Sequence, residues 1–227
     1  MLKKNGWILT MTISKKEKAT IVAAYLAKLF PTAGCELNYR QDYELVIAVM
    51  LSAQTTDASV NRVTAILFNH YPTLASLALA PILSIEQDIR SIGLYRHKAE
   101  NVHLIAQQLL NEFQGIVPAS KEQLMRLPGV GNKTANVVRA ELFHLPEFAV
   151  DTHVARVSRR LGLTSVKDNV DQIEKKLRKL YSPEDYIQLH HRFIHFGRYF
   201  CKAQKPHCYE CQLVDICLEK NKNYQSE

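Results

Sequence analysis

The chain has 227 residues, of which 47% are hydrophobic, enough to bury a sizeable core in one large domain or two smaller lobes. Lys and Arg number 29 against 22 Asp and Glu, and the formal net charge of +7 suits a polyanionic partner, although a membrane surface or plain solubility would explain it equally. No apolar run approaches the roughly 18 residues of a membrane span, and WILTM near the basic N-terminus is too short for a signal-peptide core, so we expect a cytoplasmic protein.

Helical signals follow one another along the chain, and strand signals are almost absent. Periodicity and end signals predict helices over residues 14–30, 43–53, 57–71, 97–113, 132–144, 152–161, 170–181 and 184–200. Further helix starts are predicted at Ser84-x-x-Gln87 and Ser120-x-x-Gln123, read as capping boxes, and at Ser182-Pro183. The predicted fold class is therefore all-α, with about ten helices.

Two segments interrupt this pattern. Residues 145–150 contain a proline and no helical period, and they are the predicted boundary between two lobes. A cleft between the lobes would then lie between Lys133 and Asp151. Residues 1–10 precede Met11, and we interpret them as an extension or a mis-assigned start.

A glycine-rich turn at residues 127–134 carries the first chemical signal. In LPGVGNKT, Gly129, Val130 and Gly131 form a tight turn, and the helix that follows points its positive end at whatever lies beside it. Unpaired backbone amides at such a helix end favour a phosphodiester. Lys133 lies in the first helical turn, where the helix dipole and any partial burial favour a neutral, nucleophilic amine.

An aspartate stands 18 residues after this lysine, in VDTHVARV. Asp151 could accept the lysine proton and stabilise positive charge that develops on a sugar. It is also a good N-cap for the helix predicted after it, and Lys133 could equally be a simple phosphate contact.

Four of the five cysteines lie close together near the C-terminus. Cys201, Cys208, Cys211 and Cys217 have the spacing C-x6-C-x2-C-x5-C, which favours a [4Fe–4S] cluster over structural zinc, because zinc sites usually contain two short knuckles. Disulfides are the weaker alternative, since nothing suggests secretion. Cys35 is interpreted as a small buried residue.

Together, these motifs resemble the endonuclease III family of base-excision DNA glycosylases over residues 36–217. LPGVGNKTA is similar to the family's helix-hairpin-helix, the four cysteines have the family's spacing, and LSAQTTD (51–57) and IGLYRHKAEN (92–101) match further segments. The resemblance implies that Lys133 and Asp151 are catalytic. It also implies that Gln54 fills the gap left by an extruded nucleotide and that Leu94 wedges into the opposite strand.

The resemblance further implies how the chain is organised. The helix within residues 1–34 would pack with a C-terminal lobe, residues 148–227, which carries a cluster loop at 201–217, and residues 35–147 would form the lobe with the helix-hairpin-helix. We expect the loop to hold a [4Fe–4S] cluster, and Lys202 and Lys205 to reach phosphates. The partner would be double-stranded DNA with damaged bases or abasic sites, bound by a monomer.

The activity implied is a bifunctional glycosylase and abasic-site lyase that removes oxidised or ring-saturated pyrimidines through a lysine Schiff base and β-elimination. One alternative is an adenine-mismatch glycosylase, whose branch carries a catalytic glutamate where this chain has Val49. Another is a non-catalytic DNA-binding protein with a structural or redox-sensing cluster.

Several other polar residues are given ordinary structural interpretations. His190, His191 and His195 share one predicted helix, but the spacing suggests no further metal ligand. His153 would lie near the substrate or cap its helix. Asp57 would orient the Gln54 loop or act as an N-cap.

Overall fold

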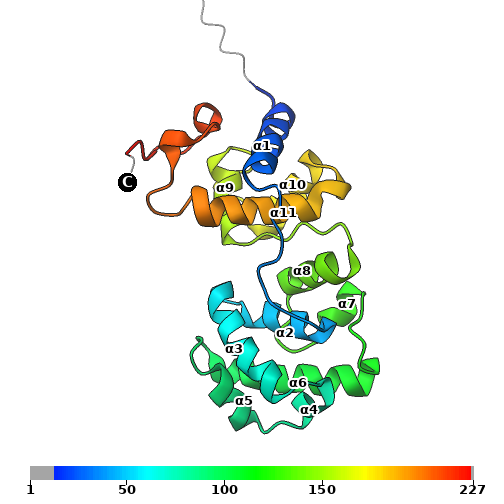
Figure 1. Cartoon of the computed structure of the whole chain (residues 1–227). Helices are drawn as coiled ribbons and strands as arrows, with labels where there is room; N and C mark the ends of the chain where they lie inside the picture. Colours follow the sequence, from blue (N-terminus) through cyan, green and yellow to red (C-terminus); the bar gives the residue numbers. More distant parts are fainter. Residues whose placement is uncertain (1–12, 226–227) are drawn as a thin grey trace, which may run out of the picture.

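The computed structural model describes residues 13–225, and every regular element in that range is helical (Figure 1). The α-helices are α1 (Lys15–Leu29), α2 (Asp42–Leu51), α3 (Asp57–His70), α4 (Leu74–Leu79), α5 (Ile82–Ile89), α6 (Tyr95–Phe113), α7 (Lys121–Leu124), α8 (Asn132–Phe143), α9 (Thr152–Arg160), α10 (Val170–Leu180) and α11 (Tyr186–His195). A π-helical turn, Phe196–Phe200, extends α11, and short 3₁₀ turns lie at Pro183–Asp185, Cys208–Glu210 and Val214–Ile216. The predicted all-α fold is confirmed. Among the described helices, none is both long and apolar enough to cross a bilayer.

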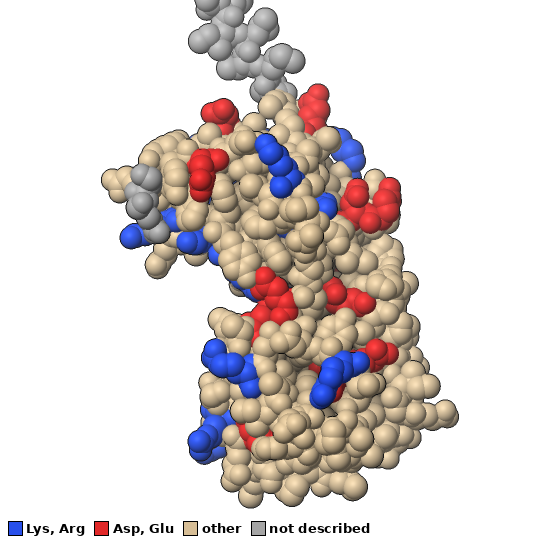
Figure 2. All heavy atoms as spheres, viewed as in Figure 1, with Lys and Arg blue, Asp and Glu red and all other residues tan. Residues whose placement is uncertain are grey.

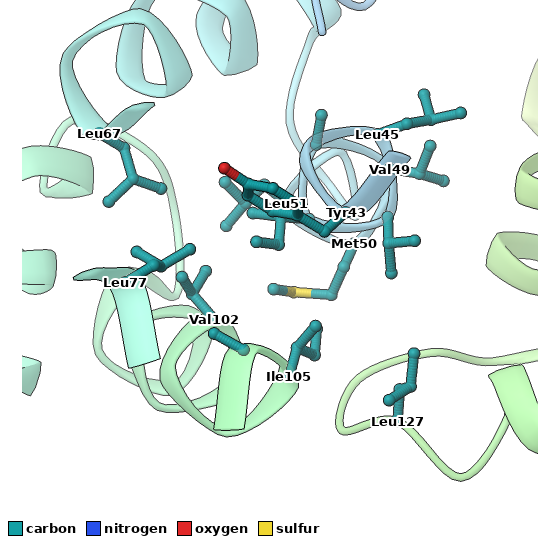
Figure 3. Close-up of a cluster of buried hydrophobic side chains, with 14 of the residues drawn as sticks. Tyr43, Leu45, Val49, Met50, Leu51, Leu67, Leu77, Val102, Ile105 and Leu127 are labelled. Atoms are coloured by element: carbon teal, nitrogen blue, oxygen red, sulfur yellow. The ribbon is translucent and has the colours of Figure 1, made fainter. Parts of the chain in front are cut away.

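The buried side chains form two separate clusters, and the first is built around α2. Every residue from Tyr43 to Leu51 is buried, because α2 is packed against α3, α6 and α8. Helices α4 and α5 pack against α6 on the other side of this cluster. The Met50 side chain points from α2 toward Ile105 of α6 (Figure 3). Leu127, just before the glycine-rich turn, belongs to the same cluster. The turn is therefore anchored to the core by the residues that precede it.

The second cluster joins the two ends of the described chain. Buried residues of α1 pack with α9, α10, α11 and the segment around Leu213. The Lys16 ammonium donates to the carbonyl of Leu180 at 2.7 Å, and Lys18 donates to that of Ile216 at 3.1 Å. Dividing the chain at residues 34 and 147 stays a prediction, and the interpretation of residues 1–10 lies outside the described residues.

Polar contacts join the two clusters. Arg198, in the π-helical turn, donates to Asp57 at 2.9 Å and also to Glu36, and His191 of α11 contacts Glu141 of α8 at 2.6 Å. The surface is hollowed between the upper and lower groups of helices, with Lys and Arg side chains above and below the hollow (Figure 2). The molecule thus presents a cleft with positive side chains above and below it and acidic side chains at its inner end, and the positive edges suit a polyanion.

One predicted helix start is wrong, and one short helix is missed. Ser84 lies inside α5, whose N-cap is Pro81, because the Pro81 carbonyl already accepts from the amides of Ser84 at 2.9 Å and Ile85 at 3.2 Å. Periodicity also misses the short helix α4, whose start is fixed by a reciprocal capping box between Thr73 and Ser76.

The other two starts are only partly as predicted. Ser120 does cap α7 and accepts from the amide of Gln123 at 3.4 Å, but α7 has only four residues, and no return bond from the Gln123 side chain is found among the described contacts. Pro183 begins a three-residue 3₁₀ turn, after which α11 runs on.

Candidate active site and DNA interface

The glycine-rich turn connects α7 to α8 in a helix-hairpin-helix. The Val130 amide donates to the Leu127 carbonyl at 3.1 Å, and the buried Val130 side chain holds the turn against the first cluster. Gly129 has φ +73°, a conformation that other residues rarely adopt. Gly131 is the N-cap of α8 and is exposed, so the first amides of α8 are open to an incoming anion.

The two glycines are expected to respond differently to alanine. A Cβ on Gly129 would lie 2.6 Å from Asn101 Nδ2 and 3.0 Å from Met50 Cγ, whereas a Cβ on Gly131 meets nothing within 4 Å. Gly129→Ala should therefore cost about 1–3 kcal/mol in unfolding free energy through overpacking and positive-φ strain. Gly131→Ala should cost under about 1 kcal/mol and yet weaken DNA binding, because its methyl group faces the space offered to a phosphate. Urea unfolding and duplex affinity measure the two effects, and equal stability of the two variants would contradict the argument.

Lys133 is the second residue of α8 and is exposed. The partial burial that would favour a neutral Lys133 amine is therefore not found. An exposed amine at a helix N-terminus is accessible to a sugar whose phosphates are bound by the neighbouring amides.

Asp151 acts as the N-cap of α9. Its Oδ1 accepts from the Val154 amide at 2.8 Å, and its Oδ2 lies 2.8 Å from His153 Nδ1. Burial raises the pKa of Asp151, but the hydrogen bonds from His153 and Val154 and the nearby charges of His153 and Lys133 outweigh burial and hold the pKa at about 2. The side chain is thus a partly buried carboxylate that is ionised at neutral pH.

The structure brings Lys133 and Asp151 near one another, although α8 packs in the first cluster and α9 in the second. Lys133 lies close enough to influence the pKa of Asp151 and also that of His190. Burial and the neighbouring His191 lower the pKa of His190 to about 4, and its Nδ1 donates to the Ala149 carbonyl at 2.8 Å. The neutral His190 side chain therefore holds, through this hydrogen bond, the segment that leads into Asp151.

Gln54 and Leu94 occupy two exposed turns with the same unusual backbone conformation. Gln54 has φ 55° in the turn between α2 and α3, and Leu94 has φ 59° as the N-cap of α6, with its side chain 62% exposed. A bulky, non-glycine residue in the left-handed region is strained, and such strain is concentrated at functional sites. The sequence motifs gave no sign of this shared conformation.

The four C-terminal cysteines line one pocket. Cys201, Cys208, Cys211 and Cys217 are all free thiols, and the pocket between them is completed by aromatic and basic side chains, among them Phe200, His207 and Arg160. Residues 13–225 contain no group of three or more His, Cys, Asp or Glu side chains placed to hold a metal ion. The donor set is nevertheless the one that an iron–sulfur cluster takes, and the buried Nε2 of His207 beside the thiols has no hydrogen-bond partner.

Arg160 is a supporting residue that sequence reasoning misses. Its guanidinium donates to the carbonyls of Lys202 at 2.7 Å and Ala203 at 3.2 Å, and to Cys201 Sγ at 3.5 Å. Lys202 is half-buried and Lys205 is exposed with φ 45°. The loop between the first two cysteines is thus tied to α9, with the Lys205 side chain left accessible.

The remaining polar residues have structural partners. Asp57 is neither an N-cap nor a free orienting group: Thr56 caps α3, and Asp57 forms the ion pair with Arg198. His195 lies 3.2 Å from the Gly34 carbonyl. His153 contacts Asp151 and does not cap α9 itself.

Comparison with known proteins identifies the class. A family model described as the HhH-GPD superfamily of base excision DNA repair proteins matches residues 47–183, more than half of the chain, and the chain belongs to that superfamily. The endonuclease III of Bacillus subtilis strain 168 is 49% identical over 197 residues, which cover 87% of this chain and 90% of that protein. The endonuclease III of Escherichia coli K12 is 42% identical over 207 residues, covering 91% of this chain and 98% of that protein.

Solved structures agree with these relatives. A structure described as a trapped endonuclease III–DNA covalent intermediate has a TM-score of 0.88 and 49% sequence identity, and the match covers 91% of this chain and 97% of that one. A non-covalent endonuclease III–DNA complex matches equally well. The chain is a base-excision-repair DNA glycosylase and abasic-site lyase of the endonuclease III type.

Proposed function

We propose that this enzyme removes oxidised or ring-saturated pyrimidines from double-stranded DNA through a Schiff base on Lys133. The observation that carries the proposal is the exposed Lys133 amine at the start of α8, near the ionised carboxylate of Asp151 at the start of α9. The Lys133 amine attacks sugar C1′ and the damaged base leaves with the bonding electrons. Loss of the amine proton and opening of the sugar ring give an imine, which makes the C2′ protons acidic enough for β-elimination of the 3′ phosphate.

Asp151 is proposed to act mainly through its charge. A carboxylate whose pKa is held at about 2 is a weak base, but it is a fixed negative charge next to a sugar that becomes cationic as the base departs. Both of its oxygens already accept hydrogen bonds, so its orientation is set before the substrate arrives. This favours charge stabilisation over proton acceptance as the role of Asp151.

The other predicted contacts supply binding. The amides at Gly129–Gly131 and the lysines Lys202 and Lys205 are proposed to bind backbone phosphates. Gln54 and Leu94 are proposed to enter the duplex and offset the few kcal/mol of unstacking that extrusion costs. We expect one chain to act alone, in the cytoplasm at the chromosome.

Borohydride trapping on defined duplexes tests the substrate class and the chemistry together. Duplexes that each contain one ring-saturated pyrimidine, one oxidised pyrimidine, one oxidised purine or one A·G mismatch are incubated with the enzyme and borohydride. We expect a covalent adduct on Lys133, located by peptide mass spectrometry, with the pyrimidine lesions only. Release of free adenine from the mismatched duplex would favour the alternative glycosylase, although buried Val49 offers no acid for that reaction.

The four cysteines are proposed to hold a [4Fe–4S] cluster, which when bound would tie the loop of Lys202 and Lys205 to α9. Burial raises the pKa of the Cys211 thiol to about 11, so metal binding must displace its proton. The protein purified without oxygen should contain about four irons per chain. Cys208→Ser should lose iron and thermal stability, whereas Cys35→Ser, which lies outside the pocket, should keep its iron. One zinc and no iron in the wild-type protein would refute this assignment.

A further inference from the structure

Lys98 is a buried lysine whose side chain donates to two neutral groups, and no ion pair to it is found within residues 13–225. Its residue is 4% exposed, and its ammonium donates to the Ala53 carbonyl and to Thr55 Oγ1, both at 2.8 Å. Burial lowers the pKa of Lys98. Lysine is almost never buried to this degree without a charged partner, because desolvation of the ammonium is unfavourable and its flexible stem normally lets it reach water.

The Lys98 ammonium binds the residues on both sides of Gln54. Ala53 and Thr55 are the two neighbours of Gln54, which has the strained φ of 55°. The backbone amide of Lys98 donates at 3.0 Å to the carbonyl of Leu94, the residue with φ 59° at the start of α6. A single residue therefore bonds to both exposed turns, with its side chain on one and its main chain on the other. Because the ammonium is buried between protein groups, it is not a phosphate contact.

The same helix also reaches the hairpin. Asn101, one turn after Lys98 on α6, is buried against Gly129, since a Cβ there would lie 2.6 Å from its Nδ2. The first two turns of α6 thus contact the Gln54 turn, carry Leu94 and support the phosphate-binding turn.

We propose that Lys98 is a positioning residue that fixes the Gln54 turn relative to Leu94, so that both side chains enter the duplex in register during base extrusion. This inference rests on the proposed function, in which these two residues occupy the DNA. Without the two bonds from the ammonium, the turn of Ala53 to Thr55 is held only by backbone bonds such as that from the Thr55 amide to the Ser52 carbonyl at 3.1 Å, and Gln54 leaves its left-handed conformation more readily. The Gln54 and Leu94 side chains are then no longer held in position to enter the duplex, so base extrusion slows. The geometry around Lys133 is unchanged.

Two substrates separate extrusion from chemistry. One is a duplex with a single ring-saturated pyrimidine, and the other is a single-stranded oligonucleotide with an abasic site, in which no base has to leave a stack. Under single-turnover conditions, Lys98→Met should slow cleavage of the duplex by roughly ten- to a hundred-fold, the loss expected for a misplacement of about 1 Å. Cleavage of the single strand should stay within about twofold of wild type. The matched control is Lys28→Met, the same substitution at an exposed lysine in α1.

Parallel variants keep this inference distinguishable from the proposed function. If Gln54→Ala and Leu94→Ala do not slow duplex cleavage, the assigned roles of these two residues fail, and the role of Lys98 fails with them. If they do slow it but Lys98→Met does not, or if Lys98→Met slows both substrates equally, only the positioning role is overturned.

A milder variant covers the case in which Lys98→Met does not fold. Thr55→Val removes one acceptor and keeps the buried lysine, and it should slow only the duplex reaction. Its effect should largely disappear in a Gln54→Ala background, because both changes act through the same turn. Additive effects of Thr55→Val and Gln54→Ala would overturn the proposal.

Discussion

Replacing Lys133 by glutamine is expected to abolish strand cleavage at abasic sites and the borohydride adduct, while duplex binding is kept. The amide side chain has no nucleophilic amine, so no imine forms, and the loss of rate should be on the order of 10³-fold or more. The open amides of α8 and the Gly129–Gly131 turn do not depend on the lysine side chain, so they still bind the phosphate.

The matched control is Lys121→Gln in α7, the other helix of the same hairpin. It removes the same charge and should keep both the adduct and the rate. Single-turnover cleavage, trapping and a fluorescence binding titration measure the three quantities. An undiminished adduct in Lys133→Gln would require a different nucleophile.

The second large effect is expected at Asp151, where charge and helix capping can be separated. Asparagine also caps helices well, so Asp151→Asn should keep the bond from the Val154 amide and stay folded. It should nevertheless slow base release by about 10²–10³-fold, because it removes a charge that acts mainly in the transition state. Asp151→Ala should lose both roles and, through the cap, about 1 kcal/mol of stability.

Single-turnover rates and urea unfolding of the two variants measure these effects. If Asp151→Asn is as fast as wild type, Asp151 is only a cap.

The low pKa of Asp151 also means that this residue stabilises the fold at neutral pH and not in strong acid. The pKa is lowered from 3.8 to about 2 in the folded protein. Its contribution to stability is therefore fully present above the unfolded value and is lost as the pH falls from about 4 toward 2. In Asp151→Asn, this part of the acid dependence of unfolding should disappear, and a comparison of urea midpoints at pH 3 and pH 6 would show it.

Local patterns predict the helices and the hairpin because these features depend on neighbouring residues. The turn at Gly129 and the helix that begins at Asn132 are encoded within a few positions. The sequence is compatible with Asp151 as a catalytic group or as an N-cap, and the structure shows the cap directly, with the carboxyl ionised at neutral pH. The two interpretations are compatible because one carboxylate oxygen binds Val154 and the other faces His153.

The supporting residues could not be predicted because they act over long sequence separations. Lys98 binds Ala53 across 45 residues, Arg160 binds Lys202 across 42, and Arg198 binds Asp57 across 141. Nothing in the spacing of these residues indicates a partner, since each contact depends on how whole helices pack. The left-handed conformation of Gln54 and Leu94 could not be predicted either, because neither residue is a glycine.

The packing of α1 against α10 and α11 has a consequence for synthesis of the chain. The first cluster draws on one continuous segment, from Leu37 to Val138, and it can close while later residues are still being added. At roughly 5–20 residues per second, α1 leaves the ribosome on the order of ten seconds before α11 is made. During much of that interval, Val22 and Leu26 lack most of the residues with which they pack. The protein is therefore assembled from its middle outward, and its earliest helix is among the last to be buried.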